Sequence, residues 1–437
     1  MDHAATLDVL YNTKWGDIPE PAQRWAQICL LDLIGVGLGG ATTPLSGIIR
    51  DHAAEDFSGK IPMLFDGRPV SPQGAALAGG MTIDALDAHD GYNPAKGHAG
   101  CGLLPALYAI WADTGAHDGP EFLTQLALGY EFACRFAVAQ HDTCPDYHTS
   151  GAWVAVAIAA IAARHYGLPR AQAHHAMGIA EYHGPRSQMM RVIDHPTMLK
   201  DGSGWGAMCG VSAVRLAMRG FTGAPAITLD TPHWGDLGHN WLVTQQYFKP
   251  YPVCRWAQGP VAAILDLKAK HGFTADDVTK IEIWSFDESV RLGQKLATTT
   301  EQAQYSTSVP CALALIHGTV APDHITAQAL ADPAVLRLSK ALVMHSDDYA
   351  NSVFPTQRPA KAAITMRDGT RYESDYHIPE WDPANPPSFD ALRRKYHAYA
   401  TPVVGATRAK AIEHAVDTLP QNGPQALFEL LCQPINR

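Results

Sequence analysis

The chain of 437 residues is longer than one hydrophobic core normally organises, which predicts two domains. Its 46% hydrophobic and 17% charged residues are typical of a globular protein, and a formal charge of -10 with interleaved signs argues against nucleic acid and membrane partners. No apolar run is long enough to span a membrane, and the first residues lack the layout of a signal peptide. Eight single cysteines without a CxxC pair suit a reducing compartment, so we expect a cytoplasmic protein.

The first 250 residues predict one helix after another. The helix at 21–40 begins at a proline, ends at a glycine pair and is apolar nearly all round, so it should be central. Gly, Pro or Asp-Gly punctuation separates the helices that follow, which predicts a large irregular helical array. We expect these helices at 71–86, 103–114, 121–140, 151–166, 170–182 and 203–219.

The pattern changes after residue 250. Alternating apolar and polar residues predict strands, and Asp368-Gly369 between two such runs predicts a hairpin. The fold class is therefore mainly α, with a large all-helical domain from residues 1–249 and 388–437 and a smaller α+β lid domain from residues 250–387. Within the second part we expect strands at 278–286, 341–344 and 361–374, helices at 260–270 and 308–317, a linker at 382–387 and a returning helical tail at 389–431.

A polar loop between two apolar helices is the first candidate site. Residues 86–105 hold Asp87, His89, Asp90, Lys96 and His98 among helix-breaking glycines and a proline. Polar groups buried between apolar helices cost free energy unless they find hydrogen-bond partners, so such groups are kept for structure or for catalysis. Catalytic acids and bases are chosen from these residue types.

Three further positions carry candidate chemistry. Tyr147 and His148 precede an apolar helix, where free amides favour an anion, although this loop taken alone is better explained by Asp146, Thr149 or Ser150 capping that helix. Lys200 precedes a Gly/Ser loop and a helix, and Lys249 lies at the expected domain boundary, where pockets are favoured. An ordinary surface position is the alternative for each lysine.

Other chemistries have weaker support. The acids and histidines of the 86–105 loop lack a recognised metal-ligand spacing, so we expect no metal. The GSGWG segment lacks the strand that precedes a hydrolase nucleophile and places Ser203 out of register. The sequence contains no phosphate-binding loop and no GxGxxG motif after a strand, so it does not indicate a nucleotide cofactor.

Several ordered blocks together resemble the MmgE/PrpD family, which includes 2-methylcitrate dehydratase, cis-aconitate decarboxylase and iminodisuccinate epimerase. The blocks cover nearly the whole chain, and their order and spacing are more specific than any one of them. They are LLDLIGVGLGG, LDAHDGYNPAKGHAG, GYEFACR, YHTSGAW, LKDGSGWGAMCGVSAVRLAMRGFTGAP, FKPYPVCR, the segment around Ser306 and the tail KYHAYATPVVGATRAKA.

The resemblance implies a homodimer, a pocket between the two domains and no cofactor. It also implies active-site roles for five residues, which are Asp87, His98, His148, Lys200 and Lys249. The chain departs from the family pattern at His89-Asp90-Gly91, at Ala99 after His98, and at Val309, where the decarboxylase can hold a functional tyrosine. These departures argue against decarboxylation of cis-aconitate.

The expected reaction is removal of a proton next to a carboxylate without a metal. We expect a dehydratase of a small hydroxy di- or tricarboxylate such as a methylcitrate-like acid, with an epimerase or isomerase of a dicarboxylate and a non-catalytic carboxylate-binding protein as alternatives. His148 or Asp87 is expected to accept the proton, His98 to protonate the leaving hydroxyl, Tyr147 to replace either acid, and Lys200 and Lys249 to bind carboxylates. Further substrate-binding candidates are Lys96, His89, Asp90, Arg186 and Ser306.

Overall fold

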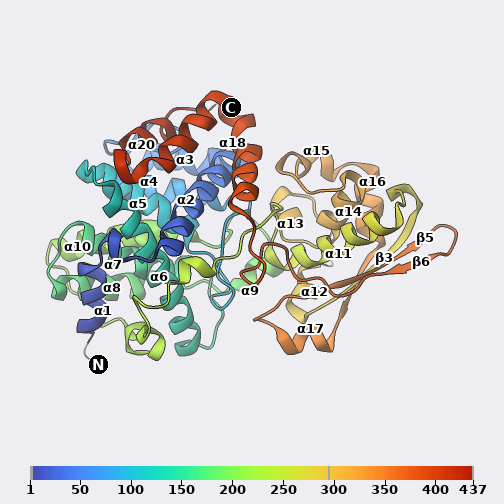
Figure 1. Ribbon diagram of the computed structural model, residues 1–437, viewed down its shortest axis with the longest axis horizontal. Coiled ribbons are helices and arrows are strands. Elements are labelled where there is room, and N and C mark those ends of the chain that lie inside the picture. The colour runs from blue at the N-terminus through green and yellow to red at the C-terminus, as the bar shows by residue number, and fades with distance from the viewer. Residues whose placement is uncertain (1–2, 294–295, 436–437) are drawn as a thin grey trace.

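The chain folds into two lobes, described by a computed structural model for residues 3–293 and 296–435 (Figure 1). The larger lobe is helical, and the smaller one, drawn in yellow to orange, contains a small mixed sheet. This confirms the predicted fold class, a mainly helical protein with an α+β C-terminal region.

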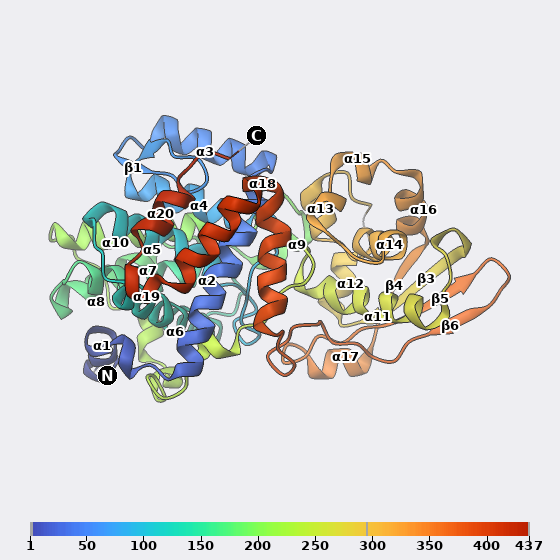
Figure 2. The ribbon, with the colours of Figure 1, turned by 45° about the horizontal axis from the view of Figure 1, so that its top comes forward.

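The helical lobe is organised around α2, whose residues are almost all buried from Ile28 onward. The C-terminal helix α18 crosses α2 and returns the chain to this lobe (Figure 2). The principal helices of the lobe are α2 (Glu20–Gly40), α4 (Pro72–Asp84), α5 (Gly100–Thr114), α6 (Gly119–Thr143), α7 (Gly151–His165), α8 (Arg170–His183), α10 (Ser203–Met218) and α18 (Phe389–Asp417).

Small residues let two of these helices meet closely. A Cβ added at Gly80 of α4 would lie 2.5 Å from the Cα of Gly204 in α10, which is shorter than any normal contact. The close approach therefore requires glycine at this crossing. It brings the end of α4, at Asp84, near the residues that precede α10.

The helical lobe also contains elements that the sequence pattern did not predict. They are short, or polar enough that no clear periodicity marks them. These elements are α1 (Ala4–Asn12), α3 (Pro44–Asp56), β1 (Ile61–Pro62), β2 (Pro69–Val70), α9 (Met189–Asp194) and the 3-10 turns Trp15–Asp17, Ile227–Asp230, Pro232–Trp234 and Leu242–Gln245. The tail predicted at 389–431 is helical but interrupted, and consists of α18, α19 (Leu419–Asn422) and α20 (Gln425–Leu431).

The smaller lobe is built on a four-stranded sheet with the order β4-β3-β5-β6. The strand β3 pairs in parallel with β4 and antiparallel with β5, and the hairpin β5–β6 turns at Gly369, whose φ of 89° favours glycine. Its elements are α11 (Arg255–His271), β3 (Val278–Ser285), α12 (Asp287–Gly293), α13 (Thr300–Gln304), α14 (Ser308–His317), α15 (Ala327–Leu330), α16 (Pro333–Ala341), β4 (Leu342–Ser346), α17 (Asp348–Val353), β5 (Lys361–Met366), β6 (Arg371–Glu373) and the 3-10 turns Ala275–Asp277 and Pro322–His324.

The two lobes have separate hydrophobic cores. One core contains buried residues from Leu7 to Phe248 and again from Leu392 to Leu431, whereas the other runs from Tyr251 to Met366. Met189, Val192 and Ile193 of α9 belong to the second core although they precede residue 250. The helix α9 therefore connects the lobes across the boundary that the sequence suggests.

Among residues 3–293 and 296–435 there is no single helix with the length and apolarity needed to cross a membrane. The pair α2 and α3 passes that test together but is bent by 93° between its two members.

Candidate active site

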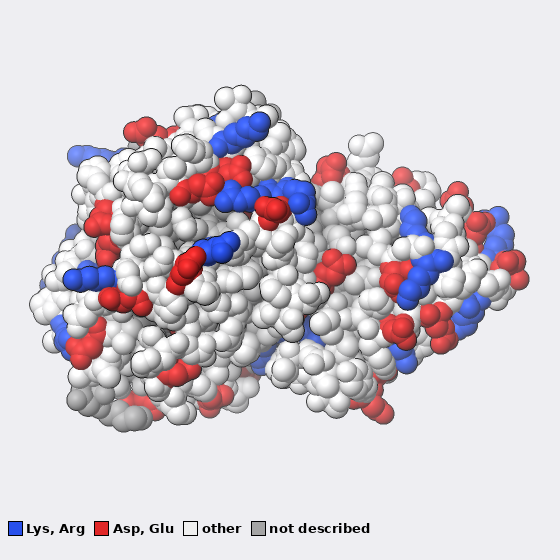
Figure 3. Space-filling model, viewed as in Figure 1, with Lys and Arg blue, Asp and Glu red and all other residues white. Residues whose placement is uncertain are grey.

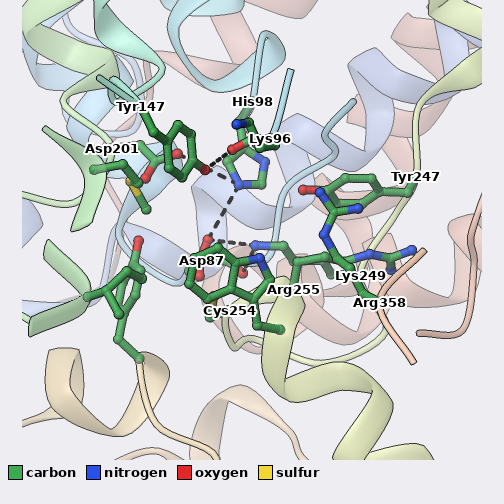
Figure 4. A pocket seen from close by; sticks show the side chains of 14 residues that line it. Asp87, Lys96, His98, Tyr147, Asp201, Tyr247, Lys249, Cys254, Arg255 and Arg358 are labelled. Atoms are coloured by element: carbon green, nitrogen blue, oxygen red, sulfur yellow. Dashed lines mark hydrogen bonds and ion pairs between the residues drawn. The ribbon is translucent and has the colours of Figure 1, made fainter. Parts of the chain in front are cut away.

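A cavity lies at the junction of the two lobes and offers about 360 Å³ of space, part of it open to solvent (Figure 4). Lys and Arg side chains are visible in the notch between the lobes in Figure 3. The helical lobe and α9 supply nine lining residues, Asp87, Lys96, His98, Tyr147, Met189, Ile193, Asp201, Tyr247 and Lys249, and the smaller lobe supplies Cys254, Arg255, Trp256, Tyr305 and Arg358.

The loop between α4 and α5 brings the first polar groups to this cavity. Main-chain hydrogen bonds pair Gly91 with Tyr247 in both directions, at 3.0 and 2.8 Å, which joins the loop to the segment that holds Lys249. Asp87 and Lys96 adopt left-handed backbone conformations, with φ of 49° and 51°. Such conformations cost free energy in residues other than glycine and often mark functional loops.

Asp87 and Lys249 form a buried ion pair in the cavity wall. Lys249 Nζ lies 2.6 Å from Asp87 Oδ1 and donates a second hydrogen bond, of 2.9 Å, to the main-chain oxygen of Asp87. Burial by itself would raise the pKa of Asp87, but the positive charges around it, that of Lys249 above all, outweigh burial and lower this pKa below its usual value. Asp87 is therefore a charged carboxylate and a weak base.

His98 has a fixed tautomer that leaves one ring nitrogen available. Its Nδ1 is hydrogen-bonded to the main-chain oxygen of Asp90, and because a carbonyl can only accept, Nδ1 carries the proton. Its Nε2 lies 3.9 Å from Asp87 Oδ1 and 3.8 Å from Asp201 Oδ2. Burial, Lys249 and His89 lower the pKa of His98 well below 6.5, so the ring is neutral and Nε2 can accept a proton.

Asp201 completes the group around His98 and was not predicted as a site residue. Its Oδ2 accepts a hydrogen bond of 2.8 Å from the Ser150 hydroxyl, while its Oδ1 has no hydrogen-bond partner in the described part of the chain. Burial, with Asp84 and Asp87, raises the pKa of Asp201 to about 8, so it holds a proton at neutral pH. In the sequence, its place between Lys200 and Gly202 is indistinguishable from a turn.

Four cationic side chains and two carboxyl groups line the cavity, and one of the carboxyl groups, that of Asp201, is neutral. The cations are Lys96, Lys249, Arg255 and Arg358, and the two arginines come from the smaller lobe. The cavity therefore carries a net positive charge that suits a substrate with more than one carboxylate. Arg255 belongs to the FKPYPVCR block and could have been found from it, whereas Arg358 has no signal in the sequence.

His89 and Asp90 lie behind His98 and do not line the cavity. The His89 ring packs edge-on against that of His98, with centroids 4.3 Å apart, and its Nε2 lies 3.1 Å from Asp84 Oδ1. The carboxylate of Asp90 accepts a hydrogen bond from Tyr130 while its main-chain oxygen holds His98. Both residues position His98, in contrast to the predicted contact with substrate.

Lys96 and Tyr147 do line the cavity and contact each other. The Tyr147 hydroxyl donates to the main-chain oxygen of Lys96, and the Lys96 ammonium lies 4.6 Å from the centre of the Tyr147 ring. His148 is buried beside them but is not a lining residue, and its Nδ1 has no hydrogen-bond partner in the chain as described. The predicted role of His148 as proton acceptor requires a position in the cavity lining, and His148 does not have that position.

Three other predicted residues also fall outside the lining. Lys200 is fully buried and its Nζ donates to Gln304, so the lysine is held behind the cavity wall. Ser306 Oγ accepts from the Val309 amide at 3.2 Å, a capping role at the start of α14. Arg186 is exposed and does not line the cavity, whose two arginines come from the other lobe.

One cluster near the site has atom types that bind metals. Ligand atoms of Asp84, His89 and Cys101 lie within 4.8 Å of one another, and all three residues are buried. Asp84 and His89 are hydrogen-bonded to each other, and Cys101 Sγ lies 3.1 Å from the Ser203 hydroxyl. Asp84 therefore positions His89, and Cys101 has a separate side-chain partner.

Comparison with known proteins agrees with this architecture. The MmgE/PrpD N-terminal domain matches residues 6–240, and the MmgE/PrpD C-terminal domain matches residues 251–421. The chain therefore belongs to the MmgE/PrpD family, and is an enzyme of this typically lyase-type family that acts on carboxylic acids. The cis-aconitate decarboxylase-like protein oryM of Aspergillus oryzae is 25% identical to it, over 93% of this chain and 92% of the relative.

Proposed function

We propose that the protein is a cofactor-independent hydro-lyase, which removes a proton next to a carboxylate of a small hydroxy di- or tricarboxylate and expels water. One observation carries the proposal. The neutral His98 ring presents Nε2 within 4 Å of Asp87 and Asp201, in a cavity lined by four cations. A base, an acid and positive charge are the components that this reaction requires.

In the first step, His98 Nε2 takes the proton from the carbon next to the carboxylate. Negative charge then moves onto the carboxylate oxygens. Lys249, fixed by Asp87, and Arg255, fixed by Asp382 at 2.8 Å, lie in the same wall and stabilise that charge. Their positions are set before the reaction, so little reorganisation is required.

In the second step, the carbon–oxygen bond breaks and the departing hydroxyl takes the proton of Asp201, which forms water and an alkene. The protonated His98 and the ionised Asp201 then face each other across 3.8 Å, and transfer of one proton restores both. These roles replace those suggested by the sequence, in which His98 was the acid and Asp87 or His148 the base. Lys249 occupies Asp87 Oδ1 at 2.6 Å and His148 does not line the cavity, and both observations disfavour that arrangement.

The test is nuclear magnetic resonance in deuterated water with a panel of hydroxy di- and tricarboxylates. The proposal expects an alkene signal to appear with loss of the hydroxyl, and expects His98→Asn to lose this activity. Deuterium uptake without loss of water would instead indicate the epimerase alternative, for which Tyr147 lines the cavity as a possible second proton donor. Binding of an acid without deuterium exchange or loss of water would indicate the non-catalytic alternative, a carboxylate-binding protein.

A further inference from the structure

Lys96 and Arg358 differ from the other two cations of the cavity, because neither forms an ion pair with a carboxylate in the described part of the chain. Lys249 is paired with Asp87, Arg255 with Asp382 and Arg358 with the side chain of Asn93. In the described ranges, 3–293 and 296–435, no carboxylate forms an ion pair with the Lys96 ammonium. Its contact is the face of the Tyr147 ring.

The surroundings of this ammonium favour an anion. Burial is the main cause that lowers the pKa of Lys96; the negative charge of Glu288 opposes it, and the positive charge of Arg358 adds to it. Two positive groups that face one cavity repel each other until a negative group enters. A carboxylate near Lys96 would relieve this repulsion and form a charge-assisted hydrogen bond.

The position of Lys96 is fixed from two sides. Its main-chain oxygen accepts from the Tyr147 hydroxyl, and its ammonium rests over the same ring, an attractive cation–π arrangement. Its backbone is left-handed, at φ 51°, and the residue lines the cavity. A lysine held this way loses less conformational entropy on binding than a free surface lysine.

Resting on the proposed function, we propose that Lys96 determines specificity by binding a carboxylate of the substrate remote from the reacting carbon. The reacting end lies among His98, Asp201 and Lys249, and the remote carboxylate lies against Lys96. The substrate class is therefore a polycarboxylate, and a monocarboxylate with the same reacting end leaves Lys96 without a partner.

The experiment measures binding of unreactive probes, so it does not depend on turnover. The affinities of butyrate, glutarate and tricarballylate are measured by calorimetry at constant ionic strength, for the wild type and for Lys96→Gln. Loss of a hydrogen bond to a charged group predicts glutarate and tricarballylate affinities about tenfold to a hundredfold weaker in Lys96→Gln. The butyrate affinity stays unchanged.

Two variants serve as controls. Lys96→Arg keeps the charge and should restore most of the affinity for the two polycarboxylates. Lys361→Gln removes a lysine that also rests on aromatic rings, those of Trp284 and Tyr376, but lies outside the cavity, and should leave every affinity unchanged.

Three results would overturn the proposal. They are equal loss of butyrate and glutarate affinity in Lys96→Gln, unchanged glutarate affinity in that variant, and a wild type that binds glutarate no better than butyrate. Failure of the lyase proposal looks different, since the charge-dependent binding would persist while no substrate loses water.

Discussion

Lys395 of α18 donates a hydrogen bond of 2.7 Å to the main-chain oxygen of Ala88, which lies next to Asp87 of the cavity wall. The same ammonium lies 2.8 Å from Asp32 Oδ1 in α2, and both side chains are buried. One lysine from the C-terminal tail thus connects the central helix to the 86–105 loop that lines the cavity. This connection links the stability of the helical lobe to the geometry of the site.

Replacing Lys395 by methionine should lower both stability and activity. The substitution leaves the Asp32 carboxylate buried without a counter-charge, which typically costs about 3–5 kcal/mol. Urea unfolding should show a lower midpoint, and the double variant Asp32→Asn/Lys395→Met should recover part of the loss. An unchanged midpoint for Lys395→Met would contradict the role of this ion pair.

The activity should show a bell-shaped dependence on pH. His98 must be unprotonated to act as a base, and its lowered pKa keeps activity high well below pH 6.5. Asp201 must be protonated to act as an acid, and its pKa of about 8 makes activity fall as pH rises through that value. In Asp201→Asn the alkaline fall should disappear along with most of the activity, and an alkaline fall that persists would exclude Asp201 as its source.

Lys249→Gln should move the acidic limb of the pH profile upward. After burial, Lys249 is the main cause of the low pKa of His98, so its removal makes the imidazole easier to protonate. As the pH is lowered from neutral, the reaction rate of the variant should therefore begin to decline at a higher pH than that of the wild type. An unshifted acidic limb would show that His98 does not set it. The double variant Asp87→Asn/Lys249→Gln controls for the buried charge that the single variant leaves unpaired.

The exposed apolar groove beside α3 and α10 is a candidate surface for the predicted homodimer. Leu199 is 65% exposed, Ile48 59% and Trp205 45%, and all three line one hollow of about 620 Å³. An apolar patch of this kind favours contact with another protein surface. We propose that a second copy covers it, which would also brace the segment that leads to Asp201.

This proposal is tested by sedimentation. The wild type should have the mass of a dimer, and Leu199→Asp should shift it toward the monomer because a charge would be buried in the contact. Ile378→Asp, at an exposed apolar position of the smaller lobe, is the matched control and should stay dimeric. A monomeric wild type, or a dimeric Leu199→Asp variant, would contradict this placement.

The sequence predicted the helices well where apolar periodicity was strong, and it also predicted the 86–105 loop. Helix α14 has the predicted bounds, and α2 begins one residue early, at Glu20. The sequence could not predict Asp201 or Arg358 as residues of the site, because the local pattern around each is that of an ordinary turn or surface segment. Their functional placement depends on the crossing of α4 with α10 and on the docking of the smaller lobe, which are tertiary relationships.

The same reason explains the predicted site residues that lie outside the cavity. Lys200 and Asp201 are neighbours, yet the backbone of Lys200, at φ 52°, sends the two side chains to different partners, Gln304 and Ser150. A sequence pattern marks the segment but not the direction of each side chain. The structure is needed to choose between adjacent titratable residues.

The central claim is that His98 removes a proton next to a substrate carboxylate. The most direct measurement is deuterium incorporation at that carbon, followed by nuclear magnetic resonance in deuterated water, for wild type and His98→Asn with the same polycarboxylate bound. The wild type should incorporate deuterium, and His98→Asn should bind the acid but exchange at least a hundredfold more slowly. Exchange at the wild-type rate in His98→Asn would contradict the assignment.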